Sequence, residues 1–303
     1  MVSIMTMLLI GLTTATTMAG ASRPFVDEVP ASSLDKLMLE VCSAQYLICS
    51  NFQIGSIKSD DVAKYLWYTI NDLQEDFFVE SSLVEGRMIT LKNNLHDPAP
   101  TRDFLSSVAA NALPALRTYN TLSIMKQFGV AQDSSMATSV ATAAYLCGGA
   151  ALPGEARSCA TSAEALAAFV AAELGNNVNV HATKGAPTST STSVVRALVT
   201  IVKVVKGSVE EGKKVVICHH LAFPSSLYYC HRVIGTKVVQ TTLKTKEGSL
   251  IKGMAICHLN TKLWLSRHPA FKALNIARGD EACHFLVEND IIFTRAMGQN
   301  TLA

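Results

Sequence analysis

The chain has 303 residues, of which 49% are hydrophobic, and a formal net charge of +2 at pH 7. The length allows one large domain or two modest ones, and the hydrophobic fraction is ample for a buried core. The charge is nearly neutral, with no basic run longer than short clusters such as Lys213-Lys214, which argues against a protein that binds nucleic acid.

Residues 1–21 have the features of a secretory signal peptide. The stretch 7–12 is mostly apolar, and Ala19-Gly20-Ala21 has the small-x-small form of a cleavage site. No Lys or Arg precedes the apolar run, so an N-terminal membrane anchor is the alternative. The run is short for a span of about 20 residues, which favours cleavage. We therefore expect a secreted, extracellular protein with no membrane segment after the signal is removed.

The pattern of residues 22–76 predicts a variable N-terminal segment that is helical. The serine pair Ser32-Ser33 can cap the first turn of one helix. A second helix is expected at 60–74, where two aspartates at its start meet the positive end of the helix dipole.

Two cysteines, Cys42 and Cys49, lie seven residues apart in the first of these helices. In a straight helix their Cα atoms would be about 10 Å apart, and a disulfide spans at most about 7 Å. They can pair with each other only if the helix breaks between them, and otherwise they pair elsewhere or stay free.

The middle of the chain predicts a strand followed by a helical hairpin. Residues 87–91 alternate between polar and apolar, as in a strand, whereas 106–116 is ambiguous between helix and loop. Two alanine-rich helices are expected at 134–147 and 161–174. Cys147 and Cys159 bracket the Gly/Pro-containing stretch between them, which predicts an inter-helix loop closed by a disulfide worth about 3 kcal/mol in the chain-entropy model.

From Val194 onward the pattern is mostly that of strands. The expected strands cover 201–205, 213–217, 228–235, 238–243, 250–257 and 291–295. The fold class is therefore α+β, with an N-terminal helical segment, an alanine-rich helical hairpin and a C-terminal, mostly antiparallel sheet.

Four Cys-His dipeptides lie in strand-like runs of this C-terminal part. They contain half of the eight cysteines and half of the eight histidines: Cys218-His219, Cys230-His231, Cys257-His258 and Cys283-His284. Neighbouring side chains of a strand point to opposite faces. Each dipeptide would send its sulfur one way and its imidazole the other. We expect four thiols on one face and four imidazoles on the other, with disulfides behind and a metal site in front.

The imidazoles of this set are candidate metal ligands. Neighbouring strands lie about 4.8 Å apart, so histidines on one face can share an ion, and histidine nitrogen suits Zn, Cu, Fe and Ni. The pattern does not choose among these metals. Of the other histidines, His268 is a weaker candidate and His220 is expected to be an exposed neighbour. His96 and His181 are interpreted as surface or structural residues.

The sulfurs of Cys218, Cys230, Cys257 and Cys283 can form disulfides or serve as metal thiolates. Structural zinc sites use shorter pairs such as C-x-x-C, and the chain has none. An even number of cysteines in a secreted chain favours disulfides. A simpler alternative is that the cysteines are structural and the histidines incidental.

The four dipeptides and their spacing resemble the signature of the plant BURP domain. The gaps between them are ten residues (220–229), twenty-five (232–256) and twenty-four (259–282). The segments SCATSAEALAAF (158–169) and HPAF (268–271) are also similar to the family pattern, whereas Val287 stands where a proline is common. The resemblance covers residues 77–296.

The resemblance implies a copper site with His219, His231, His258 and His284 as ligands. It also implies one of two functions. The first is a non-catalytic, cell-wall-associated protein of the apoplast that acts in development or stress and has a wall polysaccharide as partner. The alternative is a copper-dependent peptide cyclase that cross-links Tyr or Trp of a core peptide. No short motif repeats in 22–76, so such a cyclase would act on a separate peptide substrate.

Overall fold

We describe a computed structural model of the chain. It describes residues 77–97, 99, 101–187, 196–206, 214–232, 234–266 and 268–296. The expected signal peptide, the N-terminal helical segment and the pair Cys42 and Cys49 lie outside these residues. Within them, no helix has both the length and the apolar character needed to cross a membrane.

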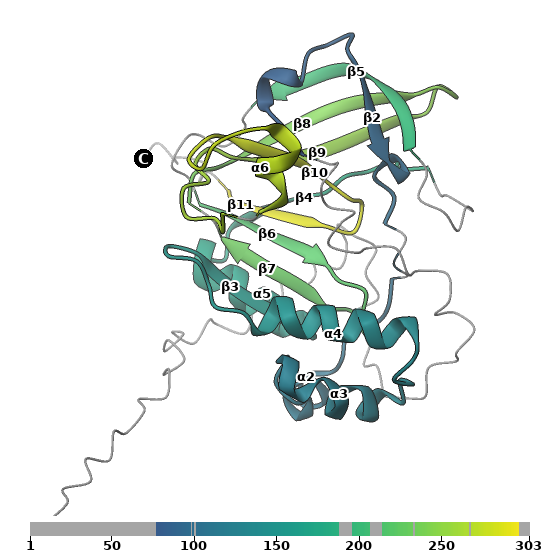
Figure 1. The fold of residues 1–303 in the computed structure, drawn as a ribbon, viewed down its shortest axis with the longest axis vertical. Helices are drawn as coiled ribbons and strands as arrows, with labels where there is room; N and C mark the ends of the chain where they lie inside the picture. Colours follow the sequence, from purple (N-terminus) through teal and green to yellow (C-terminus); the bar gives the residue numbers. More distant parts are fainter. Residues whose placement is uncertain are drawn as a thin grey trace, which may run out of the picture.

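Two antiparallel sheets and a group of helices form successive layers (Figure 1). The upper sheet has six strands in the order β1-β10-β9-β8-β5-β2. Their bounds are β1 Phe77–Phe78, β2 Met88–Lys92, β5 Arg196–Lys206, β8 Thr236–Thr245, β9 Leu250–His258 and β10 Ala282–Leu286. The lower sheet has five strands in the order β3-β7-β6-β11-β4. Their bounds are β3 Ala156–Ala160, β4 Val178–His181, β6 Val215–His220, β7 Tyr228–Arg232 and β11 Ile291–Arg295.

Three of the five α-helices among the described residues have a serine as N-cap. The α-helices are α2 Ser107–Ala112, α3 Thr121–Phe128, α4 Ser135–Gly148, α5 Ala163–Leu174 and α6 Pro269–Leu274, and the 3-10 turns are η3 Glu80–Ser82, η4 Asn93–Leu95 and η5 Thr118–Asn120. The hydroxyls of Ser106, Ser134 and Ser162 each accept a hydrogen bond from a backbone N–H of the following turn. These bonds satisfy donors that the helix itself leaves unpaired.

Alternating side chains on the strands bury three apolar layers. Val216 and Phe293 of the lower sheet pack against Leu166 and Val170 of α5. The opposite face of that sheet packs against the upper sheet through residues such as Ile217, Ile256 and Leu286. The outer face of the upper sheet is covered by Leu95 of η4 and by Leu83, which directly follows η3. Both faces of the lower sheet are therefore buried, which explains the continuous apolar run of β6.

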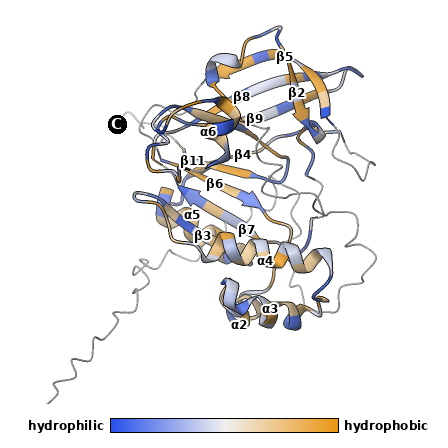
Figure 2. Cartoon of the chain, in the orientation of Figure 1, coloured by the Kyte–Doolittle hydropathy of each residue, from blue (hydrophilic) through white to orange (hydrophobic). Residues whose placement is uncertain are grey.

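The helical layer is not the hairpin that we expected. Strand β3 lies between α4 and α5, and Cys159 is part of that strand. Helix α4 packs with α3 around Ile124, Phe128 and Val140, whereas α5 packs on the lower sheet. Figure 2 shows α4 with almost no strongly hydrophilic residue, as its Ala, Ser, Thr and apolar composition requires.

The α+β class and the antiparallel pairing agree with the sequence analysis. The expectation of one C-terminal sheet is wrong, because the strands divide between two sheets. The ambiguous stretch 106–116 contains α2, with Ser106 as its N-cap.

A histidine cluster between two sheets

The four cysteines of the Cys-His pairs form two disulfides between neighbouring strands. Cys218 lies directly opposite Cys230, and Cys257 directly opposite Cys283. The first disulfide is buried under α5, and the second lies on the outer face of the upper sheet. The expectation that all four sulfurs share one face is therefore wrong, because the pairs are split between two stacked sheets.

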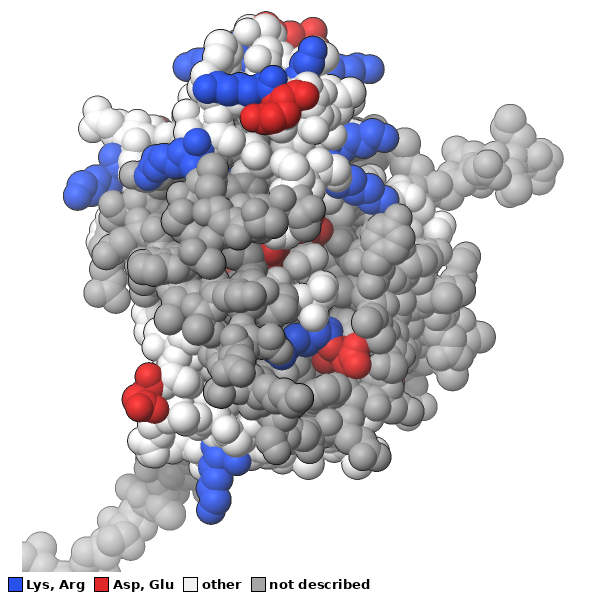
Figure 3. All heavy atoms as spheres, turned by 90° about the vertical axis from the view of Figure 1, so that its right-hand side faces the viewer, with Lys and Arg blue, Asp and Glu red and all other residues white. Residues whose placement is uncertain are grey.

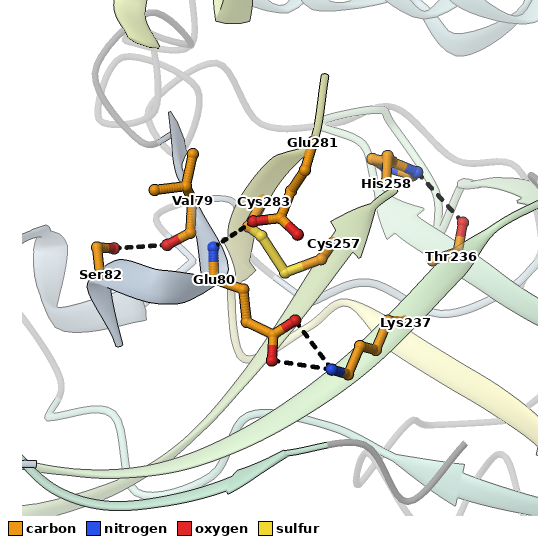
Figure 4. Close-up of a disulfide and its surroundings, with 9 residues drawn as sticks. All are labelled: Val79, Glu80, Ser82, Thr236, Lys237, Cys257, His258, Glu281 and Cys283. Carbon is orange, nitrogen blue, oxygen red and sulfur yellow. Dashed lines mark hydrogen bonds and ion pairs between the residues drawn. A yellow bond between two sulfur atoms is a disulfide. The ribbon is translucent and has the colours of Figure 1, made fainter. Parts of the chain in front are cut away.

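Figure 4 shows the second disulfide and the residues around it. Cys257 is turned toward Cys283, and the next residue, His258, is turned toward Thr236. An ion pair between Lys237 and Glu80, with N–O distances of 2.8 and 2.9 Å, closes one side of the disulfide. The alternation of the strand thus separates the sulfur of each pair from its imidazole.

The four imidazoles meet between the two sheets. His219 and His231, from the lower sheet, have ring centroids 5.4 Å apart. His258 and His284, from the upper sheet, are 5.9 Å apart. Across the sheets, the centroid distance is 5.8 Å from His219 to His284 and 6.4 Å from His231 to His258. The structure therefore brings together all four histidines that the spacing predicted, at the corners of a quadrilateral.

Each of these rings is held through its Nδ1 atom. The Nδ1 of His284 lies 3.1 Å from the carbonyl oxygen of Phe285, which can only accept. The Nδ1 of His231 lies 3.0 Å from Oε1 of Glu155. In the remaining two rings, the Nδ1 of His219 lies 3.3 Å from Oδ2 of Asp290, and the Nδ1 of His258 lies 3.2 Å from Oγ1 of Thr236.

Where the partner of Nδ1 is a carbonyl or carboxylate oxygen, which can only accept, the contact determines which nitrogen is left for a ligand. A neutral ring that donates through Nδ1 carries its lone pair on Nε2. The Nε2 atom of His231 is buried without a hydrogen-bond partner. A buried polar atom without a partner costs free energy, so this atom suits a site that takes an external ligand. Metal-binding histidines are oriented in the same way, through the other ring nitrogen.

Burial keeps most of these rings neutral. It lowers the pKa of His284 to about 3, and it lowers the pKa of His258 well below the ordinary 6.5, assisted by the neighbouring histidines. Burial also lowers the pKa of His231. For Glu155, burial alone raises the pKa, but hydrogen bonds from His231 and the Leu152 amide outweigh it, so the carboxyl pKa is lowered. The pair is a neutral imidazole donating to a carboxylate.

The donor set suits a transition metal in chemistry, and three of the four distances between neighbouring ring centroids, 5.4, 5.8 and 5.9 Å, match those of a bound site. Rings bound through Nε2 to one ion, at roughly 2.0–2.1 Å for zinc, have centroids roughly 5–6 Å apart. Among the described residues, no three His, Cys, Asp or Glu side chains converge closely enough to hold an ion as they stand. Rotation of the rings would be needed to direct the Nε2 atoms at one point.

His220, the residue after His219, belongs to a buried hydrogen-bond network that the sequence did not indicate. We expected an exposed neighbour, but the side chain is only 3% exposed and its Nδ1 lies 2.7 Å from Oδ2 of Asp97. Asn289 donates to the same oxygen at 3.0 Å. Asp290 accepts from the His220 backbone N–H and contacts His219. The expectation is therefore wrong, and this network positions the strand end that carries His219.

His268 lies beside the cluster with a different hydrogen-bonding role. Its Nδ1 accepts from the Ala270 backbone N–H at 3.3 Å and so caps helix α6. Burial lowers the pKa of His268 to about 4. The neutral ring therefore carries its proton on Nε2, which makes it a donor rather than a ligand. Its ring centroid is 4.1 Å from that of Trp264, which in turn lies 5.1 Å from His258.

The remaining candidate residues lie away from the four rings. His96 contacts the Glu288 carboxylate, and His181 Nε2 lies 3.1 Å from Thr294 Oγ1. Cys147 and Cys159 form a disulfide, and Glu155 lies in the segment that it closes. No spacing signal in the sequence marks Glu155 or Asp290, because each is far along the chain from the histidine it contacts.

Comparison with known proteins gives one family. A family model described as BURP domain matches residues 76–295. Polygalacturonase non-catalytic subunit AroGP3 of Solanum lycopersicum is 34% identical over 223 residues, covering 73% of this chain and 34% of that protein. BURP domain protein RD22 of Arabidopsis thaliana is 29% identical over 221 residues, covering 72% of this chain and 55% of RD22. BURP domain-containing protein BNM2C of Brassica napus is 27% identical over 270 residues, 84% and 92% of the two chains. The chain spans about a third of the length of the first of these relatives.

Proposed function

Because the chain belongs to the BURP-domain family, we propose that it is a secreted, non-catalytic, cell-wall-associated plant protein with a copper site at its histidine cluster. The wall association is supported by its similarity to proteins named as polygalacturonase non-catalytic subunits, which also supports association with a wall enzyme. Three disulfides among the described residues support an oxidising, extracellular location.

The observation that carries the metal part is the convergence of four imidazoles, each fixed through Nδ1, between two disulfide-linked strand pairs. The residues that would hold copper are His219, His231, His258 and His284. Neutral imidazole suits copper, and the affinity of such sites peaks at Cu(II) among first-row divalent ions. Since two ligands come from each sheet, the protein would use the ion to join the sheets.

A copper-dependent cyclase acting on a separate peptide is the second candidate. The observation that favours it is that the His219 side chain is 24% exposed, so that a peptide could reach the histidine cluster from solvent. Bound copper would supply one-electron redox chemistry with O2. The test is to incubate the protein with Cu(II), air and aromatic peptides, reduce all disulfides and analyse the products by mass spectrometry. Copper-dependent loss of two hydrogens from a peptide would establish the cyclase, and its absence would support the non-catalytic assignment.

The proposed function is tested by metal content and wall binding of the oxidised, mature protein. Copper bound after dialysis is measured for the wild type, for His258→Ala and for His96→Gln as a control outside the cluster. We expect the first substitution to remove most of the copper and the second to leave it unchanged. Equal copper in all three would remove the cluster from the assignment. Sedimentation with isolated walls tests the second part, and a protein that stays in the supernatant would contradict it.

A further inference from the structure

A row of lysines crosses the upper sheet beyond the area that the lower sheet covers. Lys203 of β5 lies opposite Thr242 of β8, which lies opposite Lys252 of β9, and Lys184 forms a bridge to Lys252. Residues opposite one another share a face. Lys252 is two residues from Met254, which packs between the sheets, so the row continues that inner face into solvent.

The backbone fixes the position of Lys184 in this row. Lys184 and Lys252 exchange two backbone hydrogen bonds, of 3.0 and 2.8 Å. The next residue, Gly185, has φ +80°, and a Cβ there would come within 2.7 Å of the Leu250 carbonyl oxygen. Only glycine allows the chain to turn this close to β9. The row is therefore a built feature of the sheet, spanning roughly 14 Å at about 4.8 Å per strand.

The surface around the row is cationic. Lys184, Lys203 and Lys252 are exposed, as is Lys244 in the neighbouring row. Among the described residues, no carboxylate forms an ion pair with any of these four lysines. Glu85 accepts from the Val204 backbone N–H at the edge of β5. Figure 3 shows Lys and Arg side chains gathered over this end of the molecule, with fewer acidic ones among them.

We propose that this lysine row binds an acidic polysaccharide, specifically a galacturonan with free carboxylates. The inference rests on the proposed function only for the wall location, since the row is separate from the histidine cluster. A regular line of ammonium groups complements a polymer with one carboxylate on each sugar. The hydroxyl of Thr242 within the row, with Thr200 and Gln240 on the same face, offers hydrogen-bond partners for sugar hydroxyls.

The same features do not favour a nucleic acid. Single strands are bound by aromatic side chains on which bases stack, and no aromatic residue occupies the described positions of this row. Duplex readers insert a helix or ribbon into a groove, whereas this surface is an open sheet face. The disulfides are also typical of secreted proteins, which favours an extracellular ligand over a nucleic acid.

The test measures binding of the full mature protein to polygalacturonate and to its methyl ester, which has the same backbone without charge. The row variant is the triple substitution Lys184→Gln, Lys203→Gln and Lys252→Gln, which removes all three lysines of the row. The matched control is Lys126→Gln, Lys262→Gln and Lys272→Gln, which removes the same charge from exposed lysines elsewhere. Thermal unfolding verifies that all variants are folded.

We expect polygalacturonate to bind the wild type and the control alike, with affinity that falls as salt rises. The row variant should bind at least tenfold more weakly, and the methyl ester should bind none of the proteins. Equal binding of polygalacturonate by the row and control variants would overturn the proposal. It would also be overturned if the wild type bound the methyl ester as tightly as polygalacturonate, or bound a DNA duplex at least as tightly. A chelator should leave polygalacturonate binding unchanged, so a failure of the copper site and a failure of the lysine row remain distinguishable.

Discussion

At the scale of single residues, Glu155 fixes the orientation of the His231 ring. Its carboxylate accepts from the histidine ring, while Tyr229 Oη lies 3.3 Å from the same oxygen. The Leu152 backbone N–H binds the other oxygen at 2.8 Å. An ionised partner at Nδ1 raises the basicity of Nε2 and fixes the ring orientation. Glu155 is therefore a positioning residue for the proposed metal site, although it would not touch the ion.

Replacing Glu155 with Gln should weaken copper binding without unfolding the protein. The amide keeps the size of the side chain but loses the charge that orients His231. We expect a loss of about 10–100-fold in copper affinity, the usual effect of removing such a partner. Competition with a chelator measures it, and Glu247→Gln in the exposed β8–β9 turn is the control. An unchanged affinity would show that Glu155 has only a structural role.

At the scale of elements, the alternation of the strands could be predicted from the sequence, but their pairing could not. The alternation of side chains along a strand predicted that each histidine and the cysteine before it point to opposite faces of the sheet, and this holds in all four strands. Which strands share a sheet depends on long-range packing, so the split into two sheets was missed. The short helices α3 and α6 were missed because neither has an extended periodic pattern, and β3 was hidden in a stretch that contains Gly and Pro.

The Cys147–Cys159 disulfide closes the segment between α4 and β3 that carries Glu155. Both cysteines are half-buried, whereas the other four described cysteines are fully buried. We expect Cys147→Ser with Cys159→Ser to lower the free energy of unfolding by about 3 kcal/mol. Copper affinity should fall in the same direction as in Glu155→Gln, but by less, because the Leu152 contact persists. Urea unfolding and chelator competition measure the two effects, and stability equal to the wild type would contradict the first.

At the scale of the whole molecule, buried neutral histidines make the metal-free protein sensitive to acid. The folded-state pKa is about 3 for His284 and about 4 for His268, both lowered by burial from 6.5. Below pH 6.5 the unfolded chain therefore binds protons that the folded chain does not. The free energy of unfolding should fall as pH falls, by up to about 1.4 kcal/mol per pH unit for each such histidine.

Urea unfolding between pH 7 and pH 4.5, with a chelator present, measures this slope. We expect His284→Gln to flatten it by close to one proton, because the variant has no ring to protonate at that position. A wild-type stability that is constant over this range would contradict the burial of neutral rings. Because the pKa of His284 in the folded protein is about 3, its ring stays neutral over this range and does not lose a ligand site to protonation.

The cross-strand disulfides can form only when the paired strands have their native register. A strand that slips by one residue would exchange its cysteine and histidine faces. It would also move a cysteine away from the partner directly opposite it, and the S–S bond could not close. Each disulfide therefore locks the native register of its strand pair, and with it the face on which the histidine lies. Protein made where thiols stay reduced lacks that constraint, so its histidine clusters should be heterogeneous even when its secondary structure is correct.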